Sequence, residues 1–134
     1  MDPFSALHLI TIVAGEAYSF ISKTYTIFQA VKAVKNAPKH AQELLKEIRS
    51  VSSLLQSLEE VVIPPHFTAS TSLKDDLIDF KSMLNEMNAR MAIVKTEKLE
   101  QVKWPFTMKE TQDKLLKIER YKATFKLALT VEIA

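Results

Sequence analysis

The chain has 134 residues, of which 47% are hydrophobic and 25% are charged, and its formal net charge is +2. These values fit one globular domain large enough to bury a core, and they are unlike those of a disordered chain. The absence of cysteine excludes disulfides and thiolate metal sites, and a single glycine excludes the glycine-rich phosphate loops and nucleophile elbows.

The positions of the three histidines give no indication of a metal site or a catalytic site. His8, His40 and His66 are scattered, and no two of them lie four residues apart, as a helical metal site would require. We therefore expect no enzyme activity, no cofactor and no metal. A chain without cysteine suits the reducing cytoplasm, and the start shows neither a basic segment nor a cleavage site of a signal peptide.

The first predicted helix follows Asp2 as N-cap and Pro3 at the first helical position, runs to about Ile21, and then continues or bends toward Val34. Residues 3–22 contain one charge, Glu16. The broad apolar face comprises Ala6, Leu7, Leu9, Ile10, Val13, Ala14, Ala17, Phe20 and Ile21. Small and neutral residues lie opposite, where a surface helix usually carries Lys or Glu. The helix is therefore either central, with both faces covered, or able to change its environment.

The second possibility makes this helix a candidate for membrane insertion. The candidate residues are Phe4, Leu7, Leu9, Ile10, Ile12, Val13, Glu16, Phe20 and Ile21. The apolar ones favour insertion by roughly 2.5–5 kcal/mol in total, and Glu16 opposes it by about 2.5–3.5 kcal/mol. The sum is near zero, so oligomerisation would have to favour insertion. Gly15 is expected to make a tight helix contact within the monomer, or alternatively between chains.

Two further helices occupy the middle of the chain. Pro38 is predicted at the first position of one helix, with a buried stripe at Leu44, Ile48, Val51, Leu55, Leu58 and Val62 and an end at Pro64-Pro65. A capping box at Ser72 and Asp75 predicts the start of the next. Its apolar positions alternate at steps of four and three, as in antiparallel bundles: Leu73, Leu77, Phe80, Leu84, Met87, Met91 and Val94.

A sharp corner precedes the last predicted helix. Trp104, Pro105 and Phe106 form it, and Pro105 ends any preceding helix. Thr107 and Glu110 form a T-x-x-E capping box for the helix that follows. The apolar face of that helix comprises Leu115, Ile118, Tyr121, Phe125, Ala128 and Leu129. We expect Trp104, the only tryptophan, to be substantially buried as a wedge between the two helices.

Positive charge is concentrated late in the chain. Residues 90–126 hold ten Lys or Arg and five acids, a net charge of +5. The proposed basic surface comprises Lys95, Lys98, Lys103, Lys109, Lys117, Arg120 and Lys122. Such a surface could bind anionic membrane lipid or an acidic partner, or it could be an ordinary solvated helix face. Nucleic acid is not expected, because the neighbouring aromatic residues occupy core-like positions.

Several segments, in this order, resemble one protein family. They are Met1-Asp2-Pro3-Phe4-Ser5 before an apolar helix, Asn36-Ala37-Pro38-Lys39 with Leu44-Leu45 and Glu47-Ile48, Lys103-Trp104-Pro105-Phe106, Leu115-Leu116, Ile118-Glu119-Arg120, Lys122 and Leu127-Ala128-Leu129. Across nearly the whole chain, this order resembles the HeLo-like and related N-terminal domains of fungal STAND immune receptors and cell-death effectors. The fold expected from periodicity and resemblance together is one all-α domain, residues 1–134, forming a bundle of four or five helices.

The resemblance implies a function in fungal innate immunity and heterokaryon incompatibility. Domains of this kind execute programmed cell death by self-association and by permeabilising the plasma membrane through the N-terminal helix. The implied protein is cytoplasmic and moves to the plasma membrane on activation, when a downstream STAND/NACHT region, an amyloid motif or a partner protein clusters it. The alternative is an adaptor: a protein-protein interaction domain that precedes a nucleotide-binding STAND region and recruits an effector.

Overall fold

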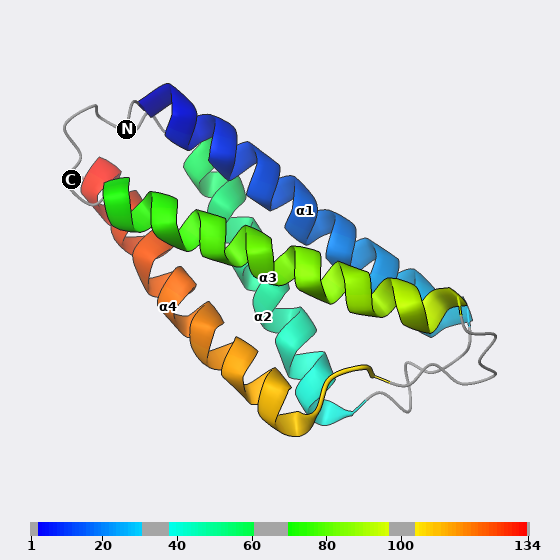
Figure 1. The fold of residues 1–134 in the computed structure, drawn as a ribbon. Helices are drawn as coiled ribbons and strands as arrows, with labels where there is room; N and C mark the ends of the chain where they lie inside the picture. Colours follow the sequence, from blue (N-terminus) through cyan, green and yellow to red (C-terminus); the bar gives the residue numbers. More distant parts are fainter. Residues whose placement is uncertain (1–2, 31–37, 61–69, 97–103, 134) are drawn as a thin grey trace.

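The computed structural model describes residues 3–30, 38–60, 70–96 and 104–133. These residues form an all-α four-helix bundle (Figure 1). The helices are α1 (Pro3–Ala30), α2 (Lys39–Glu59), α3 (Ser70–Thr96) and α4 (Met108–Ile133). Within these residues the predicted four or five helices are four, because α1 continues without a break past Ile21. The predicted N-cap Asp2 lies outside the described residues.

The helices alternate in direction, so that successive helices are antiparallel (Figure 1). Helix α1 packs against α2 and α3, and α4 packs against the same two helices from the other side. Within the described part of the chain, α1 and α4 are therefore diagonal and do not pack against each other. The beginning of α1 and the end of α4 lie at the same end of the bundle (Figure 1).

The helix boundaries follow local signals, with small corrections. The Thr107–Glu110 capping box is confirmed: the backbone N–H of Thr107 donates to Glu110 and that of Glu110 donates to the Thr107 hydroxyl, each at 3.0 Å. Pro38 is the N-cap rather than the first helical residue, and its carbonyl accepts from the N–H groups of Ala41 and Gln42. Helix α3 begins at Ser70, so the predicted capping box at Ser72 lies inside the helix.

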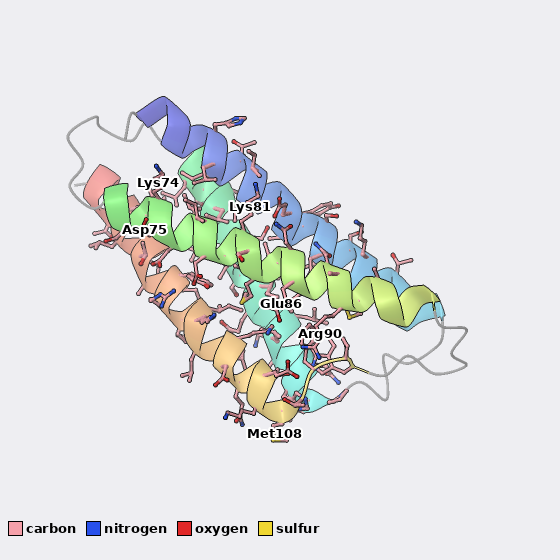
Figure 2. The ribbon with its side chains drawn as sticks, viewed as in Figure 1. Lys74, Asp75, Lys81, Glu86, Arg90 and Met108 are labelled. Carbon is pink, nitrogen blue, oxygen red and sulfur yellow. The ribbon has the colours of Figure 1, made fainter. Side chains whose placement is uncertain are left out.

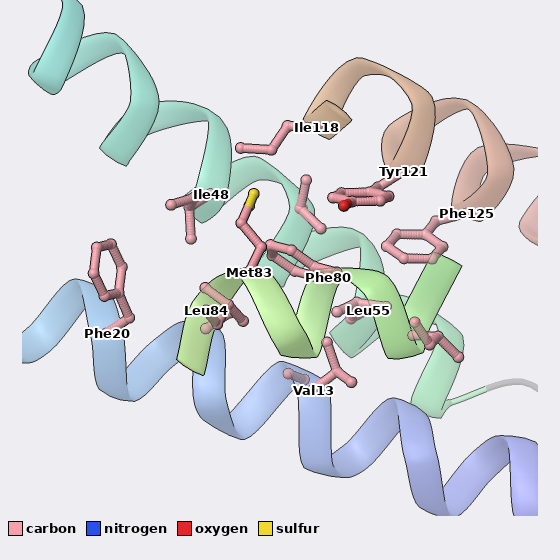
Figure 3. Packing of buried hydrophobic residues seen from close by; sticks show 14 of the residues in the cluster. Val13, Phe20, Ile48, Leu55, Phe80, Met83, Leu84, Ile118, Tyr121 and Phe125 are labelled. Atoms are coloured by element: carbon pink, nitrogen blue, oxygen red, sulfur yellow. The ribbon is translucent and has the colours of Figure 1, made fainter. Parts of the chain in front are cut away.

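The core lies where the predicted stripes meet, and Figure 3 shows part of it. All six described side chains of the alternating α3 seam, from Leu73 to Met91, are buried. Val94 lies outside the described side chains. The rings of Phe80 and Tyr121 have centroids 5.3 Å apart, and Phe125 follows Tyr121 at 6.5 Å. The first of these contacts joins α3 to α4 on the side of the bundle away from α1, and the second lies within α4.

Candidate functional site

The inner face of α1 forms part of the core. Of the proposed insertion residues, Ile10, Val13 and Phe20 are fully buried. Leu9, Ile12 and Ile21 are half-buried, and Leu9 and Ile21 pack against the same cluster. Phe4 and Leu7 lie outside the described side chains. The apolar face proposed for lipid is therefore occupied by α2 and α3 in this state, and α1 would have to leave the bundle to present it.

The outer face of α1 is exposed and carries no charged residue between His8 and Ser22. The exposed residues on it are His8, Thr11, Gly15, Tyr18 and Ser22, and Tyr18 has 67% of its surface exposed. The interpretation of α1 as a central helix with both faces covered is therefore wrong. Exposed positions on the other helices include charged residues such as Lys46, Glu86 and Lys117. The neutral outer face is thus a property of α1 and not of the bundle as a whole.

Gly15 lies in the middle of this outer face. A Cβ atom placed on it would meet no other atom within 4 Å, so the tight contact expected within the monomer is absent. Glycine inside a helix costs about 0.5–1 kcal/mol relative to alanine. No packing contact within the described chain offsets that cost.

Glu16 lies at the border between the two faces of α1 and is half-buried. One of its carboxylate oxygens is buried without a hydrogen-bond partner, as is the hydroxyl of the buried Thr24 on the same helix. No lysine or arginine among the described residues forms an ion pair with Glu16. A buried polar group without a partner destabilises the folded state by about 1–3 kcal/mol, so the attachment of α1 is weaker than apolar burial alone would give.

We predict that Glu16→Gln will increase membrane association without lowering the thermal stability of the domain. The amide removes the charge penalty of about 2.5–3.5 kcal/mol in lipid, and the variant breaks no ion pair with a described residue. Flotation with anionic liposomes and a melting curve measure the two effects. The control is Glu43→Gln, at an exposed position of α2. Equal or weaker flotation by Glu16→Gln would remove Glu16 as a barrier to insertion.

Helix α4, in contrast, is joined to its neighbours by charged and polar contacts. Arg120 contacts Asp76 at 3.3 Å and Asp79 at 2.7 Å, both on α3. Lys122 reaches Glu47 on α2 at 2.7 Å, and this carboxylate raises the pKa of the Lys122 ammonium. The Tyr121 hydroxyl donates to Asp79 at 2.5 Å. Burial and this hydrogen bond raise the pKa of Tyr121. No such ion pair joins α1 to another helix within the described residues.

The proposed basic surface is only partly free. Arg120 and Lys122 are engaged in the ion pairs above, with acids that lie outside residues 90–126. Lys109 and Lys117 are exposed and form no ion pair with a described residue. Lys95, Lys98 and Lys103 lie outside the described side chains. The fold therefore neutralises part of the +5 charge that the sequence places in this segment.

The corner before α4 is built around Phe106 rather than Trp104. Phe106 is 5% exposed, and the Arg90 guanidinium and the Lys114 ammonium lie over its ring, 4.4 Å and 4.8 Å from the ring centroid. Trp104 is half-buried, its ring centroid is 5.2 Å from that of Phe106, and its indole N–H donates to Thr111 at 3.0 Å. The prediction that Trp104 is a buried wedge is therefore confirmed in part: Trp104 is partly buried and packs against the core, but Phe106 is the more deeply buried ring of the corner.

Arg90 and Glu110 lock this corner together. The guanidinium donates to the carboxylate of Glu110 and, at 2.6 Å, to the carbonyl of Pro105. Figure 2 shows Arg90 beside the start of α4, whereas Met108 points into solvent. Hydrogen bonds from Arg90 and from the backbone of Thr107 lower the pKa of Glu110 from 4.5 to about 2. The ionised carboxylate therefore stabilises the cap of α4.

We predict that acid weakens this corner in a defined pH window. A folded-state pKa of about 2 against an ordinary value of 4.5 means that Glu110 stabilises the fold fully above pH ~4.5 and loses this effect as the pH falls toward ~2. The difference in unfolding free energy between wild type and Glu110→Gln should shrink across that window. The exposed neighbour variant Asp113→Asn is the control. A difference that stays constant with pH would contradict the role of the Glu110 charge.

A groove of about 380 Å³ runs between α1 and α2. Tyr18, Ile21, Ser22 and Tyr25 line it on α1, and Arg49, Ser52, Ser53 and Gln56 line it on α2. The groove continues the outer face of α1 toward α2, and serines and aromatic residues share its walls. Its position marks the seam along which α1 would separate from α2.

The sequence matches no protein-family model, and no curated protein or solved structure matches it. No described helix is long and apolar enough to cross a membrane. Within the described residues, no cluster of His, Asp or Glu could hold a metal ion.

Proposed function

We propose that this domain is a non-enzymatic effector of programmed cell death that permeabilises membranes after self-association, with α1 as the element that is released. The observation that carries the proposal is the uneven attachment of the helices. Apolar packing without ion pairs holds the described part of α1, whereas charged contacts join α4 to α2 and α3. The resemblance to HeLo-like domains supports the same assignment.

Release of α1 would transfer its inner face to lipid. Ile10, Val13 and Phe20 would leave the core for the bilayer, and the unpaired oxygen of Glu16 would leave its buried position. Because the sum of insertion energies is near zero, release would be conditional on clustering of the domains. A downstream STAND/NACHT region, an amyloid motif or a partner protein would provide that clustering, moving the protein from the cytoplasm to the plasma membrane.

An adaptor function is the second candidate, and one observation favours it. Cations such as Arg120 and Lys122 are paired within the chain and are less available to anionic lipid. As an adaptor, the domain would keep α1 in place and recruit a downstream protein through its surface.

A disulfide between α1 and α2 tests the release of α1. The chain has no cysteine of its own, so thiols placed across the groove report only on the engineered pair. Candidate pairs join Ser22 of α1 to Ser53 or Gln56 of α2, and the pair that forms a disulfide without lowering the melting temperature is used. The domain is fused to an inducible oligomeriser and added to anionic liposomes that contain a dye.

We expect the clustered, reduced protein to release the dye and the clustered, oxidised protein to retain it. Single variants Ser22→Cys and Ser53→Cys, treated with the same oxidant, should release the dye in both conditions. Equal leakage from the locked and unlocked forms would show that α1 need not leave the bundle. Intact vesicles with every clustered form, across lipid compositions, would favour the adaptor function.

A further inference from the structure

The exposed residues of α1 follow a regular pattern. His8, Thr11, Gly15, Tyr18, Ser22 and Tyr25 are all exposed, and they are separated by steps of three, four, three, four and three residues. This is the spacing of a heptad seam, the pattern by which one helix packs along another. We call these six exposed residues the outer seam of α1. The opposite, apolar face of α1 is already covered by α2 and α3, whereas the outer seam faces solvent.

We propose that two copies of this domain pair through the outer seam, with the two α1 helices antiparallel about a two-fold axis between Gly15 and Tyr18. A two-fold contact places the same surface patch on both sides. Charged patches repel their own copies unless opposite charges are arranged to meet. Between His8 and Ser22 the exposed face of α1 has no Lys, Arg, Asp or Glu, so two copies can approach without like-charge repulsion.

The sizes of the side chains select the antiparallel register. About this axis, Gly15 of one copy lies opposite Tyr18 of the other, so the missing side chain of one receives the ring of its partner. Tyr18 is 67% exposed, and a Cβ atom on Gly15 would meet no atom within 4 Å apart from the neighbouring residues and the backbone of its own helix. A parallel pair would set glycine against glycine and tyrosine against tyrosine, which leaves a void in one layer and crowding in another. The antiparallel pair also gives Gly15 the close contact that it lacks within the chain.

The extent of the seam sets the strength of this contact. From His8 to Tyr25 it runs roughly 25 Å along the helix. A single helix pair of this length falls at the small end of specific interfaces, below about 1,200 Å² of buried surface, where complexes are weak and transient. The domain should therefore be monomeric when dilute and paired when a fused region raises its local concentration. The pairing is one form of the self-association in the proposed function, but it needs no lipid and no release of α1, so its test can fail while the membrane function stands, and the reverse.

Engineered cysteines test the register without lipid. In the proposed pair, Thr11 of one copy lies opposite Ser22 of the other. Thr11 lies roughly 16 Å along the axis from its own equivalent, whereas a disulfide needs Cα atoms within about 7 Å. Thr11→Cys chains and Ser22→Cys chains, fused to the same oligomeriser, are oxidised separately and as a mixture. We expect the mixture to give a mixed disulfide dimer about tenfold more readily than either chain alone.

Gly15→Leu should reduce that mixed dimer by about tenfold, because the added side chain fills the space that Tyr18 enters. Its melting temperature should not fall, because position 15 is open in the monomer. The exposed α3 variant Ala89→Leu is the matched control and should leave cross-linking unchanged. The proposal is overturned if Thr11→Cys alone cross-links as well as the mixture, if no dimer forms at high local concentration, or if Gly15→Leu changes nothing.

Discussion

Phe106→Ala is expected to lower the free energy of unfolding by about 3–5 kcal/mol, the range for truncation of a buried aromatic ring. The ring is 5% exposed at the corner where α3 and α4 meet, and two cations lie over it. Contacts of this kind contribute about 0.5–2 kcal/mol each. The truncation would also leave Arg90 and Lys114 beside an empty space. Urea unfolding followed by circular dichroism measures the loss.

Trp104→Ala is the comparison that tests the position of the wedge. The indole ring is half-buried, and its removal loses one hydrogen bond to Thr111 and the contact with Phe106. We expect a smaller loss, about 1–3 kcal/mol, with the exposed Met108→Ala near zero as control. If Trp104→Ala costs more than Phe106→Ala, the tryptophan holds the corner, as the sequence alone had suggested.

At this corner the helix boundary could be predicted from the sequence, but the relative burial of Trp104 and Phe106 could not. Proline and the T-x-x-E pattern act on neighbouring residues, so the break and the start of α4 could be read locally and are confirmed. Which of two adjacent aromatic rings points inward depends on Arg90 and Lys114, which come from two different helices. Sequence spacing contains no direct information about that choice.

The four helices and their buried faces could be predicted for a similar reason, because the signals for them are local in the sequence. Alternation at steps of three and four reports which side of a helix is apolar, and the α3 seam from Leu73 to Met91 is buried as predicted. The helix ends were less accurate. The structure starts α3 at Ser70 instead of after Ser72, because a serine can cap a helix or occupy its first turn with little difference in energy.

The candidate site depends on contacts between distant parts of the chain, and so most of it could not be predicted. Lys122 and Glu47 are 75 residues apart, and the sequence around either residue gives no signal that predicts their ion pair. Asp76 and Asp79 gave one usable signal: two acids three residues apart beside an apolar seam suggest cationic partners on an adjacent helix. The neutral face of α1 was visible in the sequence, but its exposure was not.

The two outer helices of the bundle are attached in different ways, α4 by ion pairs and α1 by apolar packing. Helix α4 contacts both α2 and α3 and is joined to both by ion pairs, so it connects the two. Helix α1 covers the opposite side of the same two helices through apolar packing. Loss of α1 would leave α2, α4 and α3 joined by ion pairs as well as by packing, whereas loss of α4 would leave α2 and α3 joined only by apolar packing on α1. Opening should therefore begin at α1.

Phe20→Ala is expected to release α1 selectively. Phe20 is fully buried and is the largest core side chain among the described side chains of α1, so its truncation should cost about 3–5 kcal/mol. With the other helices still joined, most of that loss should appear as local opening. Amides of α1 would then exchange with solvent about a hundredfold faster or more, while those of α2, α3 and α4 keep most of their protection. Native-state hydrogen exchange resolves the helices separately.

Phe125→Ala in α4 is the matched control, because Phe125 is equally buried and belongs to the helix that connects the bundle. Its truncation weakens the side of the bundle that carries the ion pairs, and apolar packing on α1 is then the main contact that joins α2 to α3, so all four helices should lose protection to a similar degree. If Phe20→Ala also lowers protection evenly across the four helices, the domain opens only as a whole. In that case α1 has no separate released state, and the membrane function loses its physical basis in favour of the adaptor.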